Sequence, residues 1–431
     1  MKSYVPYKIA FVIPWYGNHT GGAEVFCKGL ASSLAALGRD VTVLTTCCRD
    51  PFHDWSKNHL PAGEERDGEV RVLRFPVSPQ DRTAFAHYYQ LIDRGIDLPP
   101  EQEEDWLSNS INSEAMYRFI AAHRSEYYFF FLPYLYGTTY YGIKAAGRRH
   151  SFLIPCLHNE PFAYLSVMQN MFSRVRGCLF LSLPERDLAT ALYPIHDKTN
   201  LFLGGGVSER VIGNAQRFRK LYGIHGPFAL YVGRKVPGKG ADLLVRYFSL
   251  YRRYRADDPL RLVMIGRGQV EIPEELRSWI LEPELSEWTH VFDAMAACEL
   301  LIQPSFFESF SLVMMEAWLN RKPVLVNGEC EVTLYHVLES NGGLYFTNLG
   351  EFVETIRLLR DKPDLALALG RAGENYVRKH YLWMDTALRL HEYVERMRTE
   401  DRESLRTSTL PEASPHTPQK LENTVSVFPA E

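Results

Sequence analysis

The feature that most constrains the fold is a repeated alternation of short apolar runs and helical stretches. Lys8 to Pro14 (KIAFVIP) is a compact apolar run that predicts a buried strand. Gly21 and Gly22 follow it, and residues 23–37 then carry apolar side chains at helical spacing. The next apolar run, Val41 to Thr46, predicts a second strand. This order predicts one β-α-β unit, and hence a parallel sheet with a right-handed crossover.

The alternation continues in two halves of similar length, separated by the glycines at 204–206. The first half predicts further strands at Val70–Phe75, Tyr128–Leu132, Phe152–Leu157 and Cys178–Leu183. The second half predicts strands at Ala229–Val232, Leu260–Ile265, Leu300–Gln303 and Pro323–Val326, and helices at 240–255, 311–320, 331–339, 350–361 and 364–379. Two such runs predict an α/β protein with two doubly wound, Rossmann-like domains that face each other across a cleft. Ligands would bind at the carboxyl ends of the strands.

Interruptions in this alternation of strands and helices suggest the domain limits. An N-terminal domain is expected over residues 1–205, with an inserted lobe or loop at 79–110, where prolines and an acidic run interrupt the pattern. A C-terminal domain is expected over residues 206–382. Residues 383–398 predict an amphipathic helix, and the Ser-, Thr- and Pro-rich segment 399–431 is expected to be a disordered tail.

Composition narrows the class of protein. The 431 residues carry a net charge of −4, which gives no overall attraction to nucleic acid. The seven cysteines include no C-x-x-C pair, which favours a reduced compartment without disulfides. No signal peptide or spanning segment is present, so we expect a cytoplasmic protein. The basic clusters 148–150 and 252–255 are interpreted as solvated helix faces. The alternative is peripheral contact with anionic lipid, or a lipid-linked acceptor, at the inner membrane face.

The strongest local signal is the segment Gln303–Ala317 (QPSFFESFSLVMMEA), where a strand, a short loop and a helix follow one another. Glu308 falls in the loop and Glu316 in the helix. Backbone N–H groups at the start of such a helix favour an anion, and a carboxylate can accept two hydrogen bonds from neighbouring sugar hydroxyls. The alternative interpretation is a charged loop followed by a helix with one surface glutamate.

A second signal is Val232–Gly240 (VGRKVPGKG), a glycine-rich turn after a predicted strand. Arg234 and Lys239 could bind a diphosphate through charge-assisted hydrogen bonds and neutralise it as a leaving group. The same segment matches a phosphate-binding P-loop except at its last position, where Gly240 replaces the Mg²⁺-binding Ser or Thr. A basic turn on the surface is a third interpretation.

Two weaker signals lie in the first half. His158 follows a predicted strand and would point into the ligand crevice, although a lone histidine is more often structural. Gly21 and Gly22 would let a ligand approach the backbone at a helix start, or they form a tight turn. The sequence contains no Asp-x-Asp pair, the simplest metal clamp for a sugar nucleotide, so no metal site is predicted.

In this order the motifs resemble glycosyltransferase family 4 (glycosyl transferases group 1), which has the GT-B fold. The resemblance covers roughly residues 8–398. The matching pieces are GGAE at Gly21–Glu24, the strand-end His158, the helix start Ser182-x-x-Glu185-Arg186, VGR…KG at Val232–Gly240, and PSFFESFSLVMMEA at Pro304–Ala317 with its E-x₇-E pair Glu308 and Glu316. Ser311 departs from the family pattern, which commonly has glycine there.

The resemblance implies roles for these residues. Arg234 and Lys239 would bind the donor diphosphate and stabilise it as it leaves. Glu308 would bind the donor sugar, Glu316 the nucleotide ribose, and His158 the sugar near the reacting carbon. The remaining donor-binding positions would act mainly through their backbone and are Phe310, Ser311, Leu312, Gly233, Gly21 and Gly22.

The resemblance also implies the reaction. The chain is expected to be a hexosyltransferase that moves a sugar from a UDP- or GDP-sugar to a hydroxyl of a glycan, lipid or small-molecule acceptor. The family retains the anomeric configuration and needs no metal or other cofactor. The helix at 383–398 resembles the C-terminal helix that crosses back to the first domain. Two alternatives remain: a P-loop-like nucleotide hydrolase and a non-catalytic sugar-nucleotide binding protein.

Overall fold

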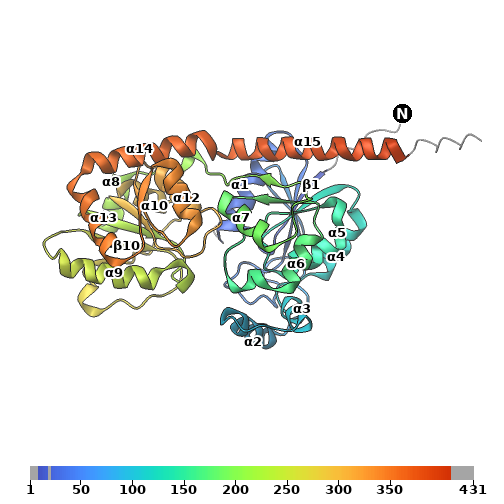
Figure 1. Cartoon of the computed structure of the whole chain (residues 1–431), viewed down its shortest axis with the longest axis horizontal. Helices are drawn as coiled ribbons and strands as arrows, with labels where there is room; N and C mark the ends of the chain where they lie inside the picture. The colour runs from blue at the N-terminus through green and yellow to red at the C-terminus, as the bar shows by residue number, and fades with distance from the viewer. Residues whose placement is uncertain (1–7, 18–20, 409–431) are drawn as a thin grey trace, which may run out of the picture. The chain divides into compact units, whose positions relative to one another are not determined.

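The computed structural model describes residues 8–17 and 21–408 of the chain (Figure 1). The first half forms an eight-stranded sheet in the order β3-β4-β2-β1-β5-β6-β7-β8. Its strands are β1 (Lys8–Val12), β2 (Val41–Thr46), β3 (Gly63–Asp67), β4 (Val70–Phe75), β5 (Tyr127–Phe131), β6 (Ser151–Leu153), β7 (Gly177–Phe180) and β8 (Leu201–Phe202). Its helices are α1 (Gly22–Ala36), α2 (Arg82–Asp93), α3 (Pro100–Ser108), α4 (Glu114–His123), α5 (Gly137–Ala146), α6 (Ser166–Ser173) and α7 (Leu183–Leu192).

Except for the antiparallel edge pair β3–β4, the paired strands of this sheet are parallel. The central strand β5 reads YYFFF, and all five of its side chains are buried. Such a continuous apolar run suits a parallel strand that helices cover on both faces. Strand β1 lies between β2 and β5, so the strand order reverses there, which is where doubly wound sheets bind ligands.

The second half forms a six-stranded sheet in the order β11-β10-β9-β12-β13-β14, and its paired strands are parallel. Its strands are β9 (Phe228–Val232), β10 (Arg261–Ile265), β11 (Ile280–Leu281), β12 (Leu300–Gln303), β13 (Val324–Asn327) and β14 (Gly343–Phe346). Its helices are α8 (Ala215–Tyr222), α9 (Ala241–Tyr254), α10 (His290–Ala297), α11 (Leu312–Leu319), α12 (Glu331–Ser340), α13 (Leu349–Asp361) and α14 (Pro363–His380). Here the order reverses between β9 and β12.

Each half has its own apolar core. Aromatic rings of β5 dominate the first core, and the second core packs α9 and α13 against β9 and β10. The fold therefore confirms the predicted α/β class with two doubly wound halves. One sheet ends at Phe202 and the other begins at Phe228, so residue 205 falls between them. The exact domain limits at 205 and 382 remain predictions.

The tail departs from its expectation, whereas the insertion does not. Residues 79–110, expected to form a lobe or a loop, contain helices α2 and α3 over most of the segment. The final helix, α15 (Trp383–Ser408), does not end at residue 398. It contains no proline or glycine, and its mixed Glu and Arg residues are good helix formers, so nothing in the sequence stops it there. The rest of the predicted disordered tail, 409–431, lies outside the described residues.

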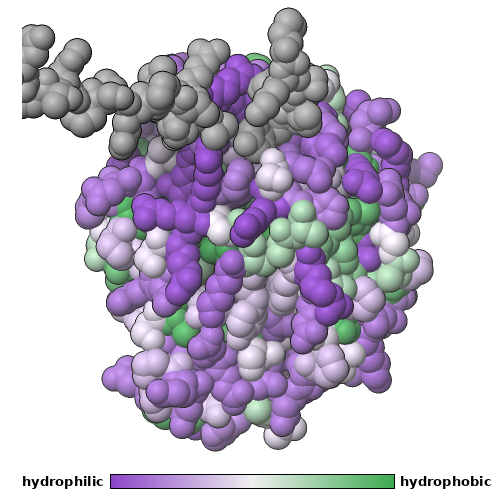
Figure 2. Space-filling model, turned by 90° about the vertical axis from the view of Figure 1, so that its right-hand side faces the viewer, coloured by the Kyte–Doolittle hydropathy of each residue, from purple (hydrophilic) through white to green (hydrophobic). Residues whose placement is uncertain are grey.

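The surface offers no long apolar element. No helix within the described ranges is long and apolar enough to cross a membrane. Figure 2 shows a face of the molecule on which hydrophilic residues predominate, with smaller apolar areas between them.

Candidate active site

An ion pair between Lys239 and Glu308 forms the centre of the candidate site. Lys239 ends the short 3₁₀ turn after β9, and Glu308 lies in the loop between β12 and α11. The Lys239 Nζ donates to Glu308 Oε1 (2.8 Å) and to the Phe307 carbonyl oxygen (2.9 Å). Gln303, the last residue of β12, also donates to Glu308 Oε1 (2.8 Å). Since β9 and β12 are neighbouring parallel strands, their carboxyl ends bring both motifs together.

The ion pair keeps Glu308 charged in a buried place. Burial alone would raise the pKa of this carboxyl, but the adjacent Lys239 ammonium and the His158 ring outweigh it and lower the pKa below its ordinary value. Glu308 is therefore a fixed carboxylate that can accept hydrogen bonds. The side chains of Lys239 and Glu308 remain 20% and 11% exposed, so a ligand can reach them.

Arg234 provides a second positive charge on the same turn. Its side chain is exposed, and no described carboxylate lies within ion-pair distance of it. The Tyr231 hydroxyl donates to the Arg234 carbonyl oxygen (2.7 Å) and fixes the turn just after Gly233. A guanidinium in the same β9–α9 loop as Lys239 adds the second cation that an anion with two adjacent phosphates would need.

The structure also explains why the turn ends in glycine. Gly240 has a φ of 67° and caps α9 in the left-handed conformation. A Cβ atom at this position would lie 2.3 Å from the Pro304 carbonyl oxygen. The position that carries the Mg²⁺-binding hydroxyl in a P-loop is therefore packed against the loop after β12. This packing argues against the P-loop interpretation.

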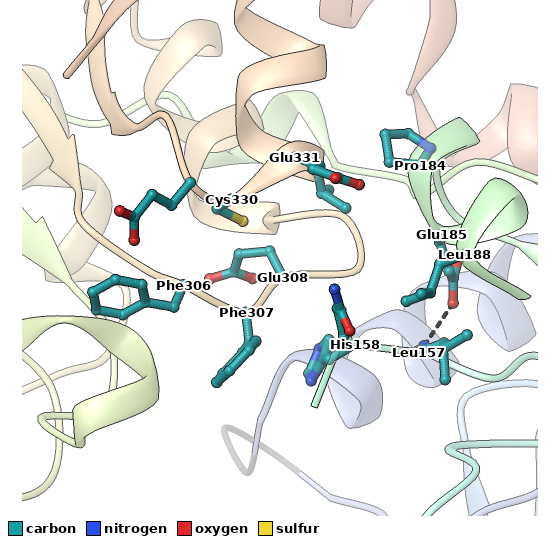
Figure 3. Close-up of a pocket in the computed structure, with 13 residues that line it drawn as sticks. Leu157, His158, Pro184, Glu185, Leu188, Phe306, Phe307, Glu308, Cys330 and Glu331 are labelled. Carbon is teal, nitrogen blue, oxygen red and sulfur yellow. Dashed lines mark hydrogen bonds between the residues drawn. The ribbon is translucent and has the colours of Figure 1, made fainter. Parts of the chain in front are cut away.

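His158 reaches the site from the first half. Strand β6 ends at Leu153, earlier than predicted, and a loop carries His158 onward. Its Nδ1 lies 3.5 Å from Glu160 Oε1, which also accepts a hydrogen bond from the Tyr134 hydroxyl (2.8 Å). The His158 ring stacks near Phe307, with 6.3 Å between ring centroids. Figure 3 shows His158 on one side of a cavity of about 70 Å³ and Glu308 on the other.

Sequence reasoning assigned no role to two glutamates next to His158. Burial favours a raised pKa for Glu160, but the hydrogen bond and charge of His158, together with Tyr134 and Lys239, lower it below its ordinary range. Burial raises the pKa of Glu185 to about 8. Glu185 accepts hydrogen bonds from the backbone N–H groups of Leu157 (2.8 Å) and Leu181. The adjacency of Glu160 to His158 was a signal that could have been used, whereas the Glu185 contacts depend on the fold.

The start of helix α11 offers backbone N–H groups that a ligand could bind. The N–H groups of Phe310, Ser311 and Leu312 form no hydrogen bond to a described residue, as expected for the first turn of a helix. Ser311 has a φ of 68°, the left-handed conformation in which glycine is least strained. The Phe310 ring packs edge-on against Tyr381 and His336, in the interior, so only its backbone is available to a ligand.

Glu316 lies one turn further along α11. Burial raises its pKa to about 8, and its carboxyl group makes no hydrogen bond or ion pair with any described residue, although the Asn320 side chain donates to its backbone carbonyl (2.8 Å). A carboxyl group without a protein partner in a partly covered place is available to hydroxyl groups of a ligand.

The glycines of the first half lie at the start of α1. Gly22 is exposed, and a Cβ atom there would meet nothing within 4 Å. Residues 18–20 of this loop lie outside the described residues. Burial raises the pKa of the nearby Glu24 to about 7, and the positive charge of Arg234 opposes this rise. The glycine segment and Arg234 therefore lie within electrostatic range of each other.

The structure thus brings Lys239, Glu308 and His158 into one cluster. Arg234 lies on the same turn as Lys239, and Glu316 on the helix after Glu308, but neither touches this cluster. Among the described residues, no group of three or more His, Cys, Asp and Glu side chains is arranged to hold a metal ion. The individual roles in binding and transfer remain predictions.

Comparisons with known proteins show what the chain is similar to. Residues 226–362, which carry the Lys239 and Glu308 motifs, match the family described as glycosyl transferases group 1. The D-inositol 3-phosphate glycosyltransferase of Pseudarthrobacter chlorophenolicus is 28% identical over 157 residues, a match that covers 33% of this chain and 37% of that protein. The chain thus spans little more than a third of this curated relative.

Two solved structures match over most of the chain. The sucrose-phosphate synthase from Thermosynechococcus elongatus has a TM-score of 0.66 at 16% identity and covers 92% of this chain and 100% of its own. HepE of Anabaena, solved in complex with UDP-glucose, has a TM-score of 0.64 at 14% identity and covers 90% and 99%. These structural similarities show that this chain has the same fold as the two proteins.

Two Rossmann-like halves with parallel sheets form the GT-B fold, which this chain shares with the two solved structures. Residues 226–362 of the second half are similar to the glycosyl transferases group 1, and the chain as a whole has the fold of these solved structures.

Proposed function

We propose that the protein transfers a sugar from a nucleotide diphosphate sugar to a hydroxyl group of an acceptor. The observation that carries this proposal is the buried Glu308 carboxylate, which Lys239 and Gln303 hold at the carboxyl end of β12. A carboxylate paired with a lysine, together with an arginine that has no ion-pair partner among the described residues, matches a ligand that combines sugar hydroxyls with a diphosphate.

The donor would lie across the second half. Arg234 and Lys239 would bind its diphosphate, and the free N–H groups at the start of α11 would add hydrogen bonds to the phosphates. Glu308 would bind the sugar hydroxyls and Glu316 the ribose. His158 would contact the sugar from the first half, near the carbon that reacts.

Lys239 and Arg234 would also act in the transfer step. When the bond between the sugar and the diphosphate breaks, negative charge builds up on the leaving phosphate, and preorganised cations stabilise it. Glu308 is engaged with Lys239 and Gln303, which supports a role in binding rather than as a nucleophile. Transfer with retention, and without a metal ion, rests on the family resemblance.

A UDP-sugar is the donor that we favour. The support for uridine is that the structurally similar HepE was solved with UDP-glucose. We also propose a cytoplasmic location, because all seven cysteines are free thiols, as a reducing compartment maintains them.

Calorimetry with UDP, GDP and ADP, each with and without EDTA, tests the donor. We expect tight binding of UDP that EDTA does not change, and slow hydrolysis of one UDP-sugar in the absence of acceptor. If none of the three nucleotides binds, the transferase proposal is wrong. Mg²⁺-dependent ATP turnover that Lys239→Ala abolishes would instead support the P-loop hydrolase.

A further inference from the structure

The lobe formed by α2 and α3 holds an ordered cluster of aromatic rings. The Trp106 ring stacks on Phe85 (6.1 Å between centroids, 14° between planes) and on Phe162 (5.3 Å, 26°). Tyr89 extends the cluster, with its ring 4.8 Å from that of Phe162. Trp106 and Phe162 are both buried, whereas Tyr89 is 43% exposed. Buried rings thus hold one exposed tyrosine ring in place.

This exposed ring lies beside the transfer site. Phe162 belongs to the 3₁₀ turn Pro161–Tyr164, which begins directly after Glu160. Helix α2 packs on this turn through Tyr89 and Phe162. Burial raises the pKa of the Tyr89 hydroxyl, Glu160 adds to the rise, and the positive charge of Arg234 opposes it. The Tyr89 hydroxyl therefore lies within electrostatic range of Glu160, from the first half of the chain, and of Arg234, from the second half.

Two polar side chains, Asn159 and Glu160, directly precede the turn on which Tyr89 packs. The Tyr134 hydroxyl and the His158 ring both contact Oε1 of the Glu160 carboxylate, so its Oε2 accepts no hydrogen bond from a described residue. The exposed Asn159 accepts a hydrogen bond from the Tyr164 hydroxyl (2.7 Å), and its amide N–H groups have no described acceptor. Among the described residues, a carboxylate oxygen without a donor and an amide without an acceptor thus stand directly before the turn that carries Tyr164 and packs on Tyr89.

A sugar ring has the complementary chemistry. Its C–H face packs on an aromatic ring, while its hydroxyl groups donate to a carboxylate and accept from an amide. A lipid tail would instead need an apolar groove without these polar groups. The exposed rings here are tyrosines, whose hydroxyls suit a wet, polar site.

We propose that Tyr89 is the stacking platform of an acceptor subsite, that Glu160 and Asn159 bind the acceptor hydroxyls, and that the acceptor is a carbohydrate. This inference rests on the proposed function, because it places the second substrate of that transfer. It also assigns a purpose to the lobe at 79–110, which the doubly wound pattern does not need.

Saturation-transfer NMR on the full chain tests the subsite. The probes are the methyl glycosides of glucose, mannose, galactose and N-acetylglucosamine, each added with saturating UDP, and n-octanol as an apolar probe. We expect at least one glycoside to receive magnetisation through its ring C–H protons. Tyr89→Ala should weaken that binding about tenfold, whereas Tyr89→Phe, which keeps the ring, should stay within about threefold.

Tyr254→Ala is the matched control, because Tyr254 is a 70% exposed tyrosine at the end of α9 in the other half. It should bind the glycoside as the unmodified protein does. If UDP binds but no glycoside does, or if Tyr89→Ala binds it unchanged, the carbohydrate subsite is wrong. Binding of octanol alone would identify an apolar acceptor and overturn it as well. Failure of UDP itself to bind would overturn the proposed function instead.

Discussion

At the residue scale, the site depends on side chains whose charge the surroundings fix. Lys239 and Glu308 are paired and partly buried, and the lysine lowers the pKa of Glu308 and so holds that carboxyl in its charged form. Glu316 has no such partner, and burial raises its pKa to about 8. Although both glutamates belong to one E-x₇-E pair, the pKa of Glu308 is lowered from its ordinary value and the pKa of Glu316 is raised. This difference supports separate roles in binding.

Lys239→Ala should mainly slow turnover. Because the lysine would stabilise the leaving diphosphate, its loss is expected to lower kcat about 10²- to 10³-fold. Steady-state kinetics with a UDP-sugar measures this. Lys57→Ala is the control, since the Lys57 side chain is 71% exposed and its partner Asp54 lies outside the site.

Glu316→Ala should instead raise the dissociation constant of UDP. Equal losses of binding in both variants, with turnover of bound donor unchanged, would contradict these roles.

Donor binding should depend on pH through Glu316. Its carboxyl, with a pKa of about 8, is mostly protonated at pH 7, and the ribose hydroxyls need a carboxylate that accepts both hydrogen bonds. Binding must then release a proton, so UDP affinity should rise up to about tenfold from pH 7 to pH 9 and level off above about pH 9. Calorimetry across this range measures the rise. Glu316→Gln, which cannot ionise, should bind with little pH dependence, and a flat profile for the unmodified protein would refute the role.

At the scale of elements, glycines allow close contact between loops that carry the site. Gly240 lets the turn after β9 pack against Pro304, and this contact sets how near Lys239 comes to the loop of Glu308. Ser311, in contrast, adopts the left-handed conformation without being glycine. Such strain is common where a backbone is held in a functional position.

Gly240→Ala should destabilise the protein. The new Cβ would lie 2.3 Å from the Pro304 carbonyl oxygen and would also have to adopt a φ of 67°. We expect a loss of about 2–3 kcal/mol in the free energy of unfolding, measured by denaturant titration. Gly226→Ala is the control, because a Cβ at Gly226 meets nothing within 4 Å, and it should change stability by no more than about 1 kcal/mol. Equal stability of the two variants would exclude the proposed packing.

At the scale of the whole molecule, the start of α15 links segments that are far apart in the sequence. The Trp383 ring lies 5.8 Å from that of Phe26, and a Cβ atom at Gly29 or Gly206 would collide with it. The Arg389 Nε donates to the Leu203 carbonyl oxygen (2.8 Å). The first turns of α15 therefore pack on α1 and on the connection between the two sheets.

Trp383→Ala should lower the free energy of unfolding by about 2–3 kcal/mol, because the ring is only partly buried and a full burial would cost more. Thermal and denaturant unfolding measure the loss. Leu388→Ala on the same helix is the control, since Leu388 is 39% exposed, and its effect should be about 0.5 kcal/mol. If the two variants lose the same stability, the contacts of Trp383 are not a specific link.

The local patterns of the sequence determined the α/β class, both doubly wound halves and the motifs of the second half. Apolar runs, glycines and helical spacing are local properties, so strands such as β2 (Val41–Thr46) and β4 (Val70–Phe75) were predicted to the residue. Short strands such as β8, with two residues, and the helices of the 79–110 lobe were missed because their local signals are weak.

Only the tertiary structure decided which of these residues meet. The pairing of Lys239 with Glu308 depends on β9 and β12 lying side by side, although 68 residues separate the lysine from the carbonyl of Phe307 that it also binds. The backbone contacts of Glu185 and the packing of Tyr89 on Phe162 likewise join distant segments. Strand order and burial are properties of the whole chain, and they set both the neighbours of each ionisable group and its pKa.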